Sequence, residues 1–272
     1  MSTTALALAL TAAFIHAAWN LALARQDDIE AATGVAMVVG VIAFLPVAAL
    51  TWDLEREAIP FIVVTAILQL VYFAGLATAY RLAELSVVYP IARGVAPVLV
   101  LVIGVAFLSE PTSLRQIGGV LLVGVGVLLV RGLDRVREKD GVFLGLAIAS
   151  VIAAYTLVDA RGVEHADPLT YLTLAMLPAS AVYLGYVVSR GGVPRVRAAT
   201  SWTVALAGIG SFLAYVLVLA ALQRAPAAAV AAVRETSIVI ATALAARILH
   251  EKVSRLRVAG AVLVVAGVAL LS

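Results

Sequence analysis

The sequence contains no cysteine, which excludes disulfide bonds, thiol nucleophiles and cysteine metal ligands. Charged residues are also scarce: they make up 13% of the chain, whereas soluble domains carry about 25%. In their place, 64% of the residues are hydrophobic. Water could not solvate a surface of this composition, so most of the surface is expected to face lipid.

The signatures of common enzymes and nucleotide-binding modules are absent as well. The chain has no HExxH, GxSxG or Walker motif and no clustered histidine–carboxylate site. We therefore expect no catalytic activity, no metal and no cofactor. The net charge of +3 comes mainly from 17 arginines, nearly all of which lie between apolar runs. This pattern suits anionic lipid headgroups and does not require nucleic acid as a partner.

Ten apolar runs divide the chain, each close to the roughly 20 residues that cross a bilayer. In lipid the backbone must satisfy its own hydrogen bonds, so each run is predicted to be a helix. The predicted helices cover residues 4–24, 30–51, 58–80, 86–108, 113–131, 141–160, 168–189, 201–222, 227–249 and 255–271. The predicted fold class is therefore all-α, a polytopic membrane protein with ten transmembrane helices.

The second half of the chain repeats the first. A shift of 141 residues aligns residues 93–130 with residues 234–271 without a gap. The matched charged and glycine positions are Arg93 with Arg234, Glu110 with Glu251, Gly119 with Gly260 and Gly126 with Gly267. We divide the chain into five-helix repeats at 1–137 and 138–272. An odd number of helices gives the second repeat the opposite orientation, and inverted repeats are typical of transporters with a binding site near mid-bilayer.

The same segments resemble the EamA-type permeases of the drug/metabolite transporter superfamily. The resemblance rests on Leu108-Ser109-Glu110 and Leu249-His250-Glu251, each followed by a glycine-spaced helix, and on Ala17-Ala18-Trp19-Asn20 in the first helix. It covers essentially the whole chain. It implies a central cavity lined by parts of helices one, three, four, six, eight and nine. It also implies alternating access between the two halves.

Two arginines lie deep inside apolar helices at equivalent positions of the repeat, Arg93 and Arg234. Arginine at the bilayer centre costs at least ~2.5–3.5 kcal/mol, so each should face protein or water and have a partner. Two facing guanidinium groups would suit a carboxylate, phosphate or phosphonate. The structural alternative is an internal salt bridge, for example between Arg93 and Glu235.

Glu235 is the carboxylate deepest in an apolar run, whereas Glu84 and Asp159 sit nearer helix ends. Burial could make Glu235 a proton carrier, but a neighbouring arginine would keep it ionised. Ion pairing is the reading we favour, with proton coupling and contact with a substrate amine as alternatives.

Prolines surround Arg93 in the fourth predicted helix. Pro90 and Pro97 flank it, Gly94 follows it, and Tyr89 shares its helix face. Proline removes a backbone hydrogen bond, so this helix is expected to be bent or unwound. The bend could expose backbone groups to a ligand or could be a packing kink. The ninth helix has no internal proline and is expected to differ here.

Further polar and aromatic side chains complete the candidate substrate site. His16 and Asn20 lie four residues apart with Trp19 beside them, and hydrogen bonding between helices is the simpler reading for this pair. The full candidate set is Arg93, Arg234, Tyr89, Glu235, His16, Asn20, Trp19, Tyr72, Tyr155 and Tyr215.

These features favour a secondary transporter for a small polar or zwitterionic, amino-acid-like metabolite. The alternatives are a permease for organic anions such as phosphonates or sugar phosphates, and a lipid-linked flippase. The expected partners are a small-molecule substrate and membrane lipids, with protons as a candidate coupling ion. Both a monomer and a homodimer are compatible with the sequence.

Basic residues are divided unequally between the two membrane sides. Loops after odd-numbered predicted helices hold thirteen lysines and arginines, and the other side holds only Arg56, Arg115, Arg161 and Arg224. Positive residues favour the cytoplasm, so both termini are predicted to be periplasmic in a bacterial inner membrane.

Overall fold

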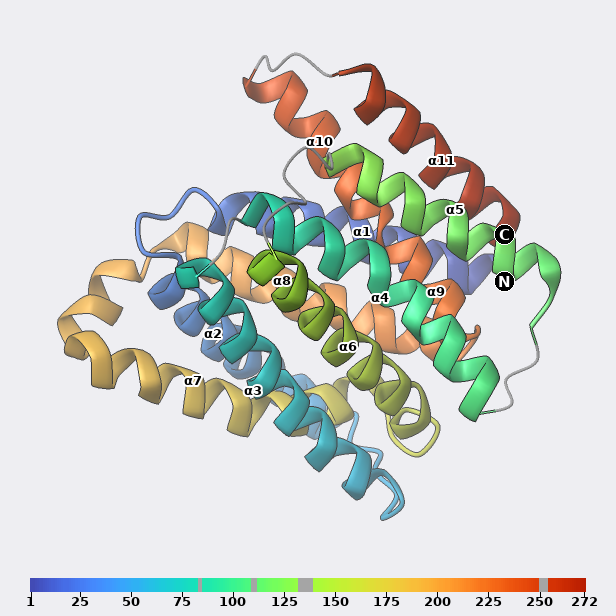
Figure 1. Cartoon of the computed structure of the whole chain (residues 1–272). Coiled ribbons are helices and arrows are strands. Elements are labelled where there is room, and N and C mark those ends of the chain that lie inside the picture. Colours follow the sequence, from blue (N-terminus) through green and yellow to red (C-terminus); the bar gives the residue numbers. More distant parts are fainter. Residues whose placement is uncertain (83–84, 109–111, 132–138, 250–253) are drawn as a thin grey trace.

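Helices make up nearly all of the computed structural model, which describes residues 1–82, 85–108, 112–131, 139–249 and 254–272 (Figure 1). The first half contributes α1 (Thr3–Leu23), α2 (Ile29–Leu50), α3 (Ala58–Leu82), α4 (Leu85–Phe107) and α5 (Leu114–Arg131). The second half contributes α6 (Lys139–Gly162), α7 (Pro168–Ala199), α8 (Trp202–Leu222), α9 (Ala227–Arg234), α10 (Thr236–Leu249) and α11 (Arg255–Leu271).

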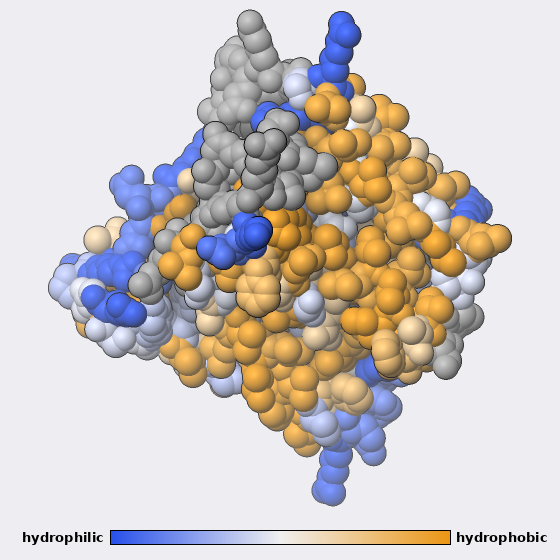
Figure 2. Space-filling model, in the orientation of Figure 1, coloured by the Kyte–Doolittle hydropathy of each residue, from blue (hydrophilic) through white to orange (hydrophobic). Residues whose placement is uncertain are grey.

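The predicted all-α membrane fold is confirmed, and most helix ends lie within two residues of their predicted positions. Within the described ranges, eight candidate spans are long and apolar enough to cross a membrane, and α5 is a shorter apolar helix. One of these spans begins in α9 and crosses into α10, because together the two form the ninth predicted helix. One face of the molecule is largely hydrophobic, with hydrophilic residues gathered at its margins (Figure 2).

The two glycine pairs between α5 and α11 display the inverted repeat directly. A Cβ atom on Gly119 would lie 2.9 Å from the carbonyl oxygen of Gly267, and one on Gly126 would lie 2.7 Å from that of Gly260. Because the repeat equates Gly119 with Gly260 and Gly126 with Gly267, each contact is the image of the other. A reciprocal contact of this kind requires a two-fold axis between the helices, as inverted halves demand.

The other helix contacts follow the same exchange of halves. Helix α1 packs on α8 as α3 packs on α6, and α4 packs on α6 as α9 and α10 pack on α1. Helices α2 and α7 contact each other across the axis. The N-terminal ammonium group donates to the carbonyl oxygen of Leu271 at 2.9 Å. The two termini therefore lie side by side (Figure 1), as an even number of crossings requires.

Two local departures from the prediction shape the site. Helix α7 does not end at residue 189 but continues to Ala199 beyond a kink at Gly192, whose φ of 73° is in the left-handed region. Helix α4 was expected to be bent or unwound at Pro90 and Pro97; it is a continuous helix there, so it is not unwound. Membrane helices tolerate internal proline when neighbouring groups satisfy the freed backbone. The interruption occurs instead in the ninth predicted helix, between α9 and α10, where no proline is present.

Candidate functional site

A cavity of about 470 Å³ lies among helices of both halves. Its lining extends to Ala24 and Asp27 in the exposed loop between α1 and α2, so the cavity opens at that end. Besides the helices implied by the resemblance, α2 and α7 contribute to it. Nine of the ten candidate residues line this cavity: His16, Trp19, Asn20, Tyr72, Tyr89, Arg93, Tyr155, Tyr215 and Arg234. The tenth, Glu235, contacts Arg93.

Arg93 forms an ion pair across the two halves. Its Nε atom lies 3.2 Å from Oε2 of Glu235, and the two side chains are only 5% and 4% exposed. Its Nη2 atom also donates to Nε2 of His16 at 3.0 Å. The salt bridge considered from the sequence is therefore present, and it leaves Arg93 at the cavity wall with its charge balanced.

His16 is held in one neutral form by its two neighbours. Nε2 of His16 faces both the guanidinium of Arg93 and, at 2.9 Å, Nδ2 of Asn20. Both of these nitrogens can only donate, so Nε2 must accept and the ring proton must reside on Nδ1. His16 thereby joins α1 to α4 by a hydrogen bond between helices, the simpler of the two readings made from the sequence.

Trp19 packs edge-on against His16, with ring centroids 4.8 Å apart. Its Nε1 atom is buried and has no hydrogen-bond partner among the described residues. A buried donor without an acceptor is energetically unfavourable, so an acceptor atom of a ligand in the cavity would satisfy it.

Arg234 differs from its repeat counterpart in its surroundings. It is the last residue of α9 and is 8% exposed. Its guanidinium carbon lies 5.6 Å from the centre of the Tyr215 ring, a cation–π contact. In the part of the chain that the structure describes, no carboxylate lies within ion-pairing distance of Arg234. Arg234 therefore faces the cavity without a described carboxylate in direct contact, although its charge also acts on the nearby buried Asp159.

The turn between α9 and α10 explains how two consecutive residues, Arg234 and Glu235, make different contacts. The amide of Glu235 donates to the carbonyl oxygen of Ala232, and the amide of Ile238 donates to that of Glu235, each at 3.0 Å. These bonds span three residues, so the helix tightens locally, as often occurs at functional positions in membrane helices. Arg234 faces the cavity while Glu235 reaches Arg93.

Aromatic rings form one wall of the cavity. The rings of Tyr72 and Tyr155 lie 6.1 Å apart edge to face, and those of Tyr155 and Tyr215 lie 6.2 Å apart. Phe73 packs on Tyr72 and also on Tyr183. The wall combines apolar ring faces with hydroxyl groups, a surface suited to a compact solute that has both apolar and polar parts.

Asp159 lies near the end of α6, as its sequence position indicates, and it was not among the candidate site residues. It is completely buried. Its Oδ1 atom accepts hydrogen bonds from Thr65 at 2.5 Å and Tyr171 at 3.1 Å, and its Oδ2 atom accepts from Tyr215 at 2.5 Å. The hydroxyls of Thr65 and Tyr171 also lie 2.7 Å apart. These partners come from three different helices, α3, α7 and α8. They meet Asp159 only in the folded protein, so no residue spacing in the sequence predicts the cluster.

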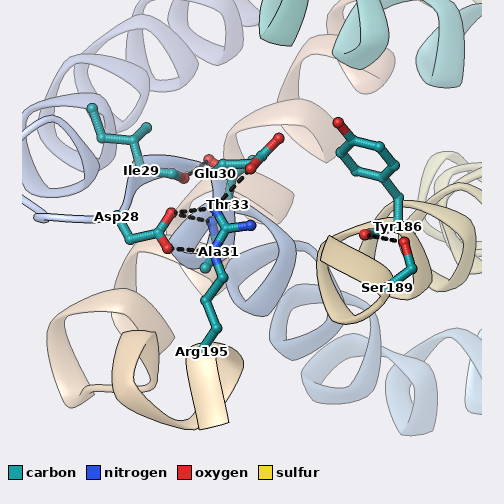
Figure 3. Close-up of polar contacts among 8 residues, drawn as sticks. All are labelled: Asp28, Ile29, Glu30, Ala31, Thr33, Tyr186, Ser189 and Arg195. Atoms are coloured by element: carbon teal, nitrogen blue, oxygen red, sulfur yellow. Dashed lines mark hydrogen bonds and ion pairs between the residues drawn. The ribbon is translucent and has the colours of Figure 1, made fainter. Parts of the chain in front are cut away.

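The open end of the cavity is acidic, and one arginine binds two of the acidic side chains there. Arg195, which follows the kink in α7, donates to both carboxyl oxygens of Asp28 at 2.6 and 2.9 Å and to Glu30 at 2.7 Å (Figure 3). The hydrogen bond and charge of Arg195 lower the pKa of the Asp28 carboxyl group, and the amide of Ala31 adds to this effect. The cluster ties the start of α2 to the end of α7.

Two loops pair at the opposite end of the bundle. Leu54 and Ala166 form an isolated antiparallel bridge. The amide of Glu55 donates to the carbonyl oxygen of His165 at 2.9 Å, and Nδ1 of His165 lies 2.9 Å from Oε2 of Glu55. Loops from both halves are therefore joined at the end of the bundle away from the cavity mouth. Glu84, Glu110 and Glu251 lie outside the described residues.

Comparison with known families and structures agrees with this architecture. The family model described as "EamA-like transporter family" matches residues 3–132 and again residues 139–272. A solved structure, described only as the crystal structure of a protein, matches with a TM-score of 0.79 at 15% identity, covering 99% of this chain and 98% of that one. At this identity the likeness shows the fold alone. A comparison with curated proteins gave no match.

Proposed function

This chain belongs to the EamA-like transporter family, within the drug/metabolite transporter superfamily, and we propose that it carries a small polar or zwitterionic metabolite by alternating access. The substrate would be amino-acid-like, with an anionic group that binds Arg234. The observation that supports this most strongly is the position of Arg234, which lines the cavity without a carboxylate partner among the described residues. A guanidinium binds a carboxylate in a two-pronged geometry that lysine cannot provide.

The cavity offers complementary groups for the rest of such a solute. Trp19 and Asn20 can supply donors, and the wall of tyrosines can cover an apolar part. The volume of about 470 Å³ accommodates a small molecule and falls in the usual range of ligand pockets, roughly 300–1,000 Å³. Acidic residues at the mouth would favour entry of solutes that also carry an ammonium group.

The arrangement of the two ends suits alternating access. One end is open at the loop between α1 and α2, and at the other the loops around Leu54 and Ala166 are joined. Exchange of conformations between inverted halves would open the second end and close the first. If the side rich in basic residues is cytoplasmic, as predicted, the open end faces the cytoplasm.

An organic anion such as a phosphonate or sugar phosphate is the second candidate substrate. It is favoured by two guanidinium groups at one cavity and by the Trp19 Nε1 atom, which has no hydrogen-bond partner among the described residues. Phosphonates would require more neutralisation than a carboxylate, and Arg93 is already balanced by Glu235.

A binding screen distinguishes the two classes. Purified protein would be heated with L-alanine and other amino acids, methylphosphonate and glucose phosphate, since a ligand that binds only the native state raises the melting temperature. Compounds that stabilise the protein would then be tested for uptake and exchange in proteoliposomes. Stabilisation by amino acids with carrier-dependent exchange supports the first candidate. Stabilisation confined to phosphonates or sugar phosphates supports the second. No stabilisation and no exchange would reject both.

A further inference from the structure

We propose that Asp159 binds and releases a proton that is coupled to transport, and that Tyr215 connects this carboxyl group to the substrate cavity. The proposal rests on the transport function proposed above and assigns its coupling group. From the sequence, Glu235 was the candidate for this role. In the structure Glu235 is paired with Arg93, and the ion pair favours the charged carboxylate and opposes proton uptake.

Asp159 has different neighbours. It is 0% exposed, and among the described residues its side chain accepts hydrogen bonds from neutral hydroxyl groups, those of Thr65, Tyr171 and Tyr215. Within the described ranges it forms no ion pair. The charge of Arg234 acts on Asp159 without direct contact. A buried carboxylate with no directly paired cation is costly, whereas hydroxyl groups can rotate to serve either the carboxylate or the carboxylic acid. The cluster can therefore hold Asp159 in both protonation states.

Tyr215 links this cluster to the candidate substrate site. Its hydroxyl donates to Oδ2 of Asp159 and accepts from Nε2 of Gln69 at 3.3 Å, while its ring lies against the guanidinium of Arg234. Tyr215 and Gln69 also line the cavity. An anionic group bound at Arg234 would thus lie one side chain away from Asp159 and would act on its proton affinity through the field.

The location of Asp159 is that of a group between the two membrane sides. Its backbone carbonyl accepts from the amide of Val163, the first residue of the loop that pairs with residues 53–55 at the end away from the cavity mouth. Its side chain reaches Tyr215 at the cavity wall. In the alternating access proposed above, opening of that end would bring the carboxyl group, now buried behind Tyr215, within reach of the second membrane side.

Charge balance supports coupling to an anionic group. Charged and titratable side chains occur both in the cluster and at the adjoining cavity wall. They are His16 on α1, Tyr72 on α3, Tyr89 and Arg93 on α4, Tyr155 on α6, Tyr171 on α7, Tyr215 on α8, Arg234 on α9 and Glu235 beyond it. With Asp159 and Glu235 ionised, the charges of these groups sum to zero. An anionic group bound at Arg234 therefore adds one negative charge next to the cluster, even when the solute carries a compensating ammonium group elsewhere. A proton from cavity water, passed through the Tyr215 hydroxyl to Oδ2 of Asp159, cancels this negative charge, and the reverse transfer releases the proton.

Infrared difference spectroscopy tests the proton site without a substrate. Wild-type protein in liposomes, compared between neutral and acidic pH, should show the carbonyl band of a buried protonated carboxyl group. Asp159→Asn should abolish this band, and Glu235→Gln should retain it. A band that survives in Asp159→Asn, or is lost only in Glu235→Gln, would overturn the assignment. If Asp159→Asn fails to fold, Asp159→Glu serves in its place, because it must shift the frequency of the band.

Proton movement tests the coupling. Proteoliposomes containing a pH-sensitive dye would receive a gradient of the compound that binds best among L-alanine, methylphosphonate and glucose phosphate. Wild type should move protons with the solute, whereas Asp159→Asn should lose proton movement and retain solute exchange. Tyr215→Phe should also lose proton movement. Tyr186→Phe, on the exposed part of α7, is the matched control. Undiminished proton movement in Asp159→Asn refutes the coupling role while leaving the transport function intact. A wild-type protein that moves no solute refutes the transport function and the coupling role, and the infrared band then still reports whether Asp159 titrates.

Discussion

The Nε atom of Arg93 lies 3.2 Å from Oε2 of Glu235, although the two residues belong to different halves of the chain. The pair joins the middle of α4 to the turn between α9 and α10. Because Arg234 directly precedes Glu235, the same turn supplies an acid to one deep arginine and presents the other arginine to the cavity. The symmetric pair of cations seen in the sequence is therefore asymmetric in its electrostatics: one forms an ion pair and the other faces the cavity.

Removing the acid from this pair should destabilise the protein. Glu235→Gln would leave the Arg93 guanidinium buried without a counter-charge, which typically costs about 3–5 kcal/mol in protein interiors. We expect a clearly lower melting temperature in detergent. The matched control is Glu164→Gln, which removes an exposed pair with Arg161 and should change little, since exposed pairs contribute about 0–1 kcal/mol.

The double variant Arg93→Gln with Glu235→Gln separates pairing from other roles of Glu235. Replacing both charges removes the unbalanced cation, so stability should recover relative to Glu235→Gln alone. A double variant as unstable as the single one would show that the ion pair is not the reason for the loss.

The close contact between α5 and α11 should tolerate no side chain. A methyl group on Gly126 would lie 2.7 Å from the carbonyl oxygen of Gly260, so Gly126→Ala must push the two helices apart. Overpacking of this kind costs about 1–3 kcal/mol. Gly185→Ala in α7 is the control, because no atom lies within 4 Å of the added methyl group. Melting temperatures should fall for the first variant only, and equal values for both would contradict the packing assigned to this pair.

Asp28 at the cavity mouth should stabilise the protein at neutral pH and lose this stabilising effect only at acidic pH. Arg195 lowers the pKa of Asp28 in the folded protein, so the stabilisation is present at neutral pH and is lost as pH falls through that lowered value, below the ordinary 3.8. The melting temperature of Asp28→Asn should therefore be below that of wild type at neutral pH and converge with it in acid. Asp27→Asn, at an exposed neighbour, is the control. A difference that persisted below the titration of Asp28 would contradict this cause.

The orientation in the membrane follows from loop charge and remains a prediction. Both termini should lie on the periplasmic side, since thirteen of the basic residues between helices belong to the opposite side. A fluorescent protein that matures only in the cytoplasm, fused after Ser272, should remain dark. A bright fusion would reverse the orientation and place the cavity mouth on the periplasmic side.

The membrane fold was predictable because hydrophobic run length and the internal repeat are properties of local sequence. Leu114–Arg131 and Arg255–Leu271 form helices within one residue of their predicted bounds, and the glycine matches between them mark a real contact. The positions of Arg93 and Arg234 at the cavity could also be predicted from the sequence, because a charged side chain deep in the membrane must avoid lipid.

The parts that escaped prediction depend on contacts between distant segments. Asp159 lies three residues from the end of α6, and only the arrival of Thr65, Tyr171 and Tyr215 from three other helices makes its environment an interior one. The interruption at Glu235 has no proline or glycine to signal it. Pro90 and Pro97 predicted a bent or unwound helix, but α4 is continuous there. Neighbouring helices can satisfy the backbone groups that proline leaves without a hydrogen bond.

Arg234 is proposed to bind the anionic group of the substrate, and ligand affinity in Arg234 variants measures this contact. A charge-assisted hydrogen bond contributes about 1.5–3 kcal/mol, so the dissociation constant of the best ligand should rise by roughly 10- to 150-fold in Arg234→Gln. Arg234→Lys should give a smaller loss, because it keeps the charge and lacks the planar fork. Arg224→Gln, in the exposed loop after α8, should bind like wild type. Unchanged affinity in a folded Arg234→Gln protein would contradict the account.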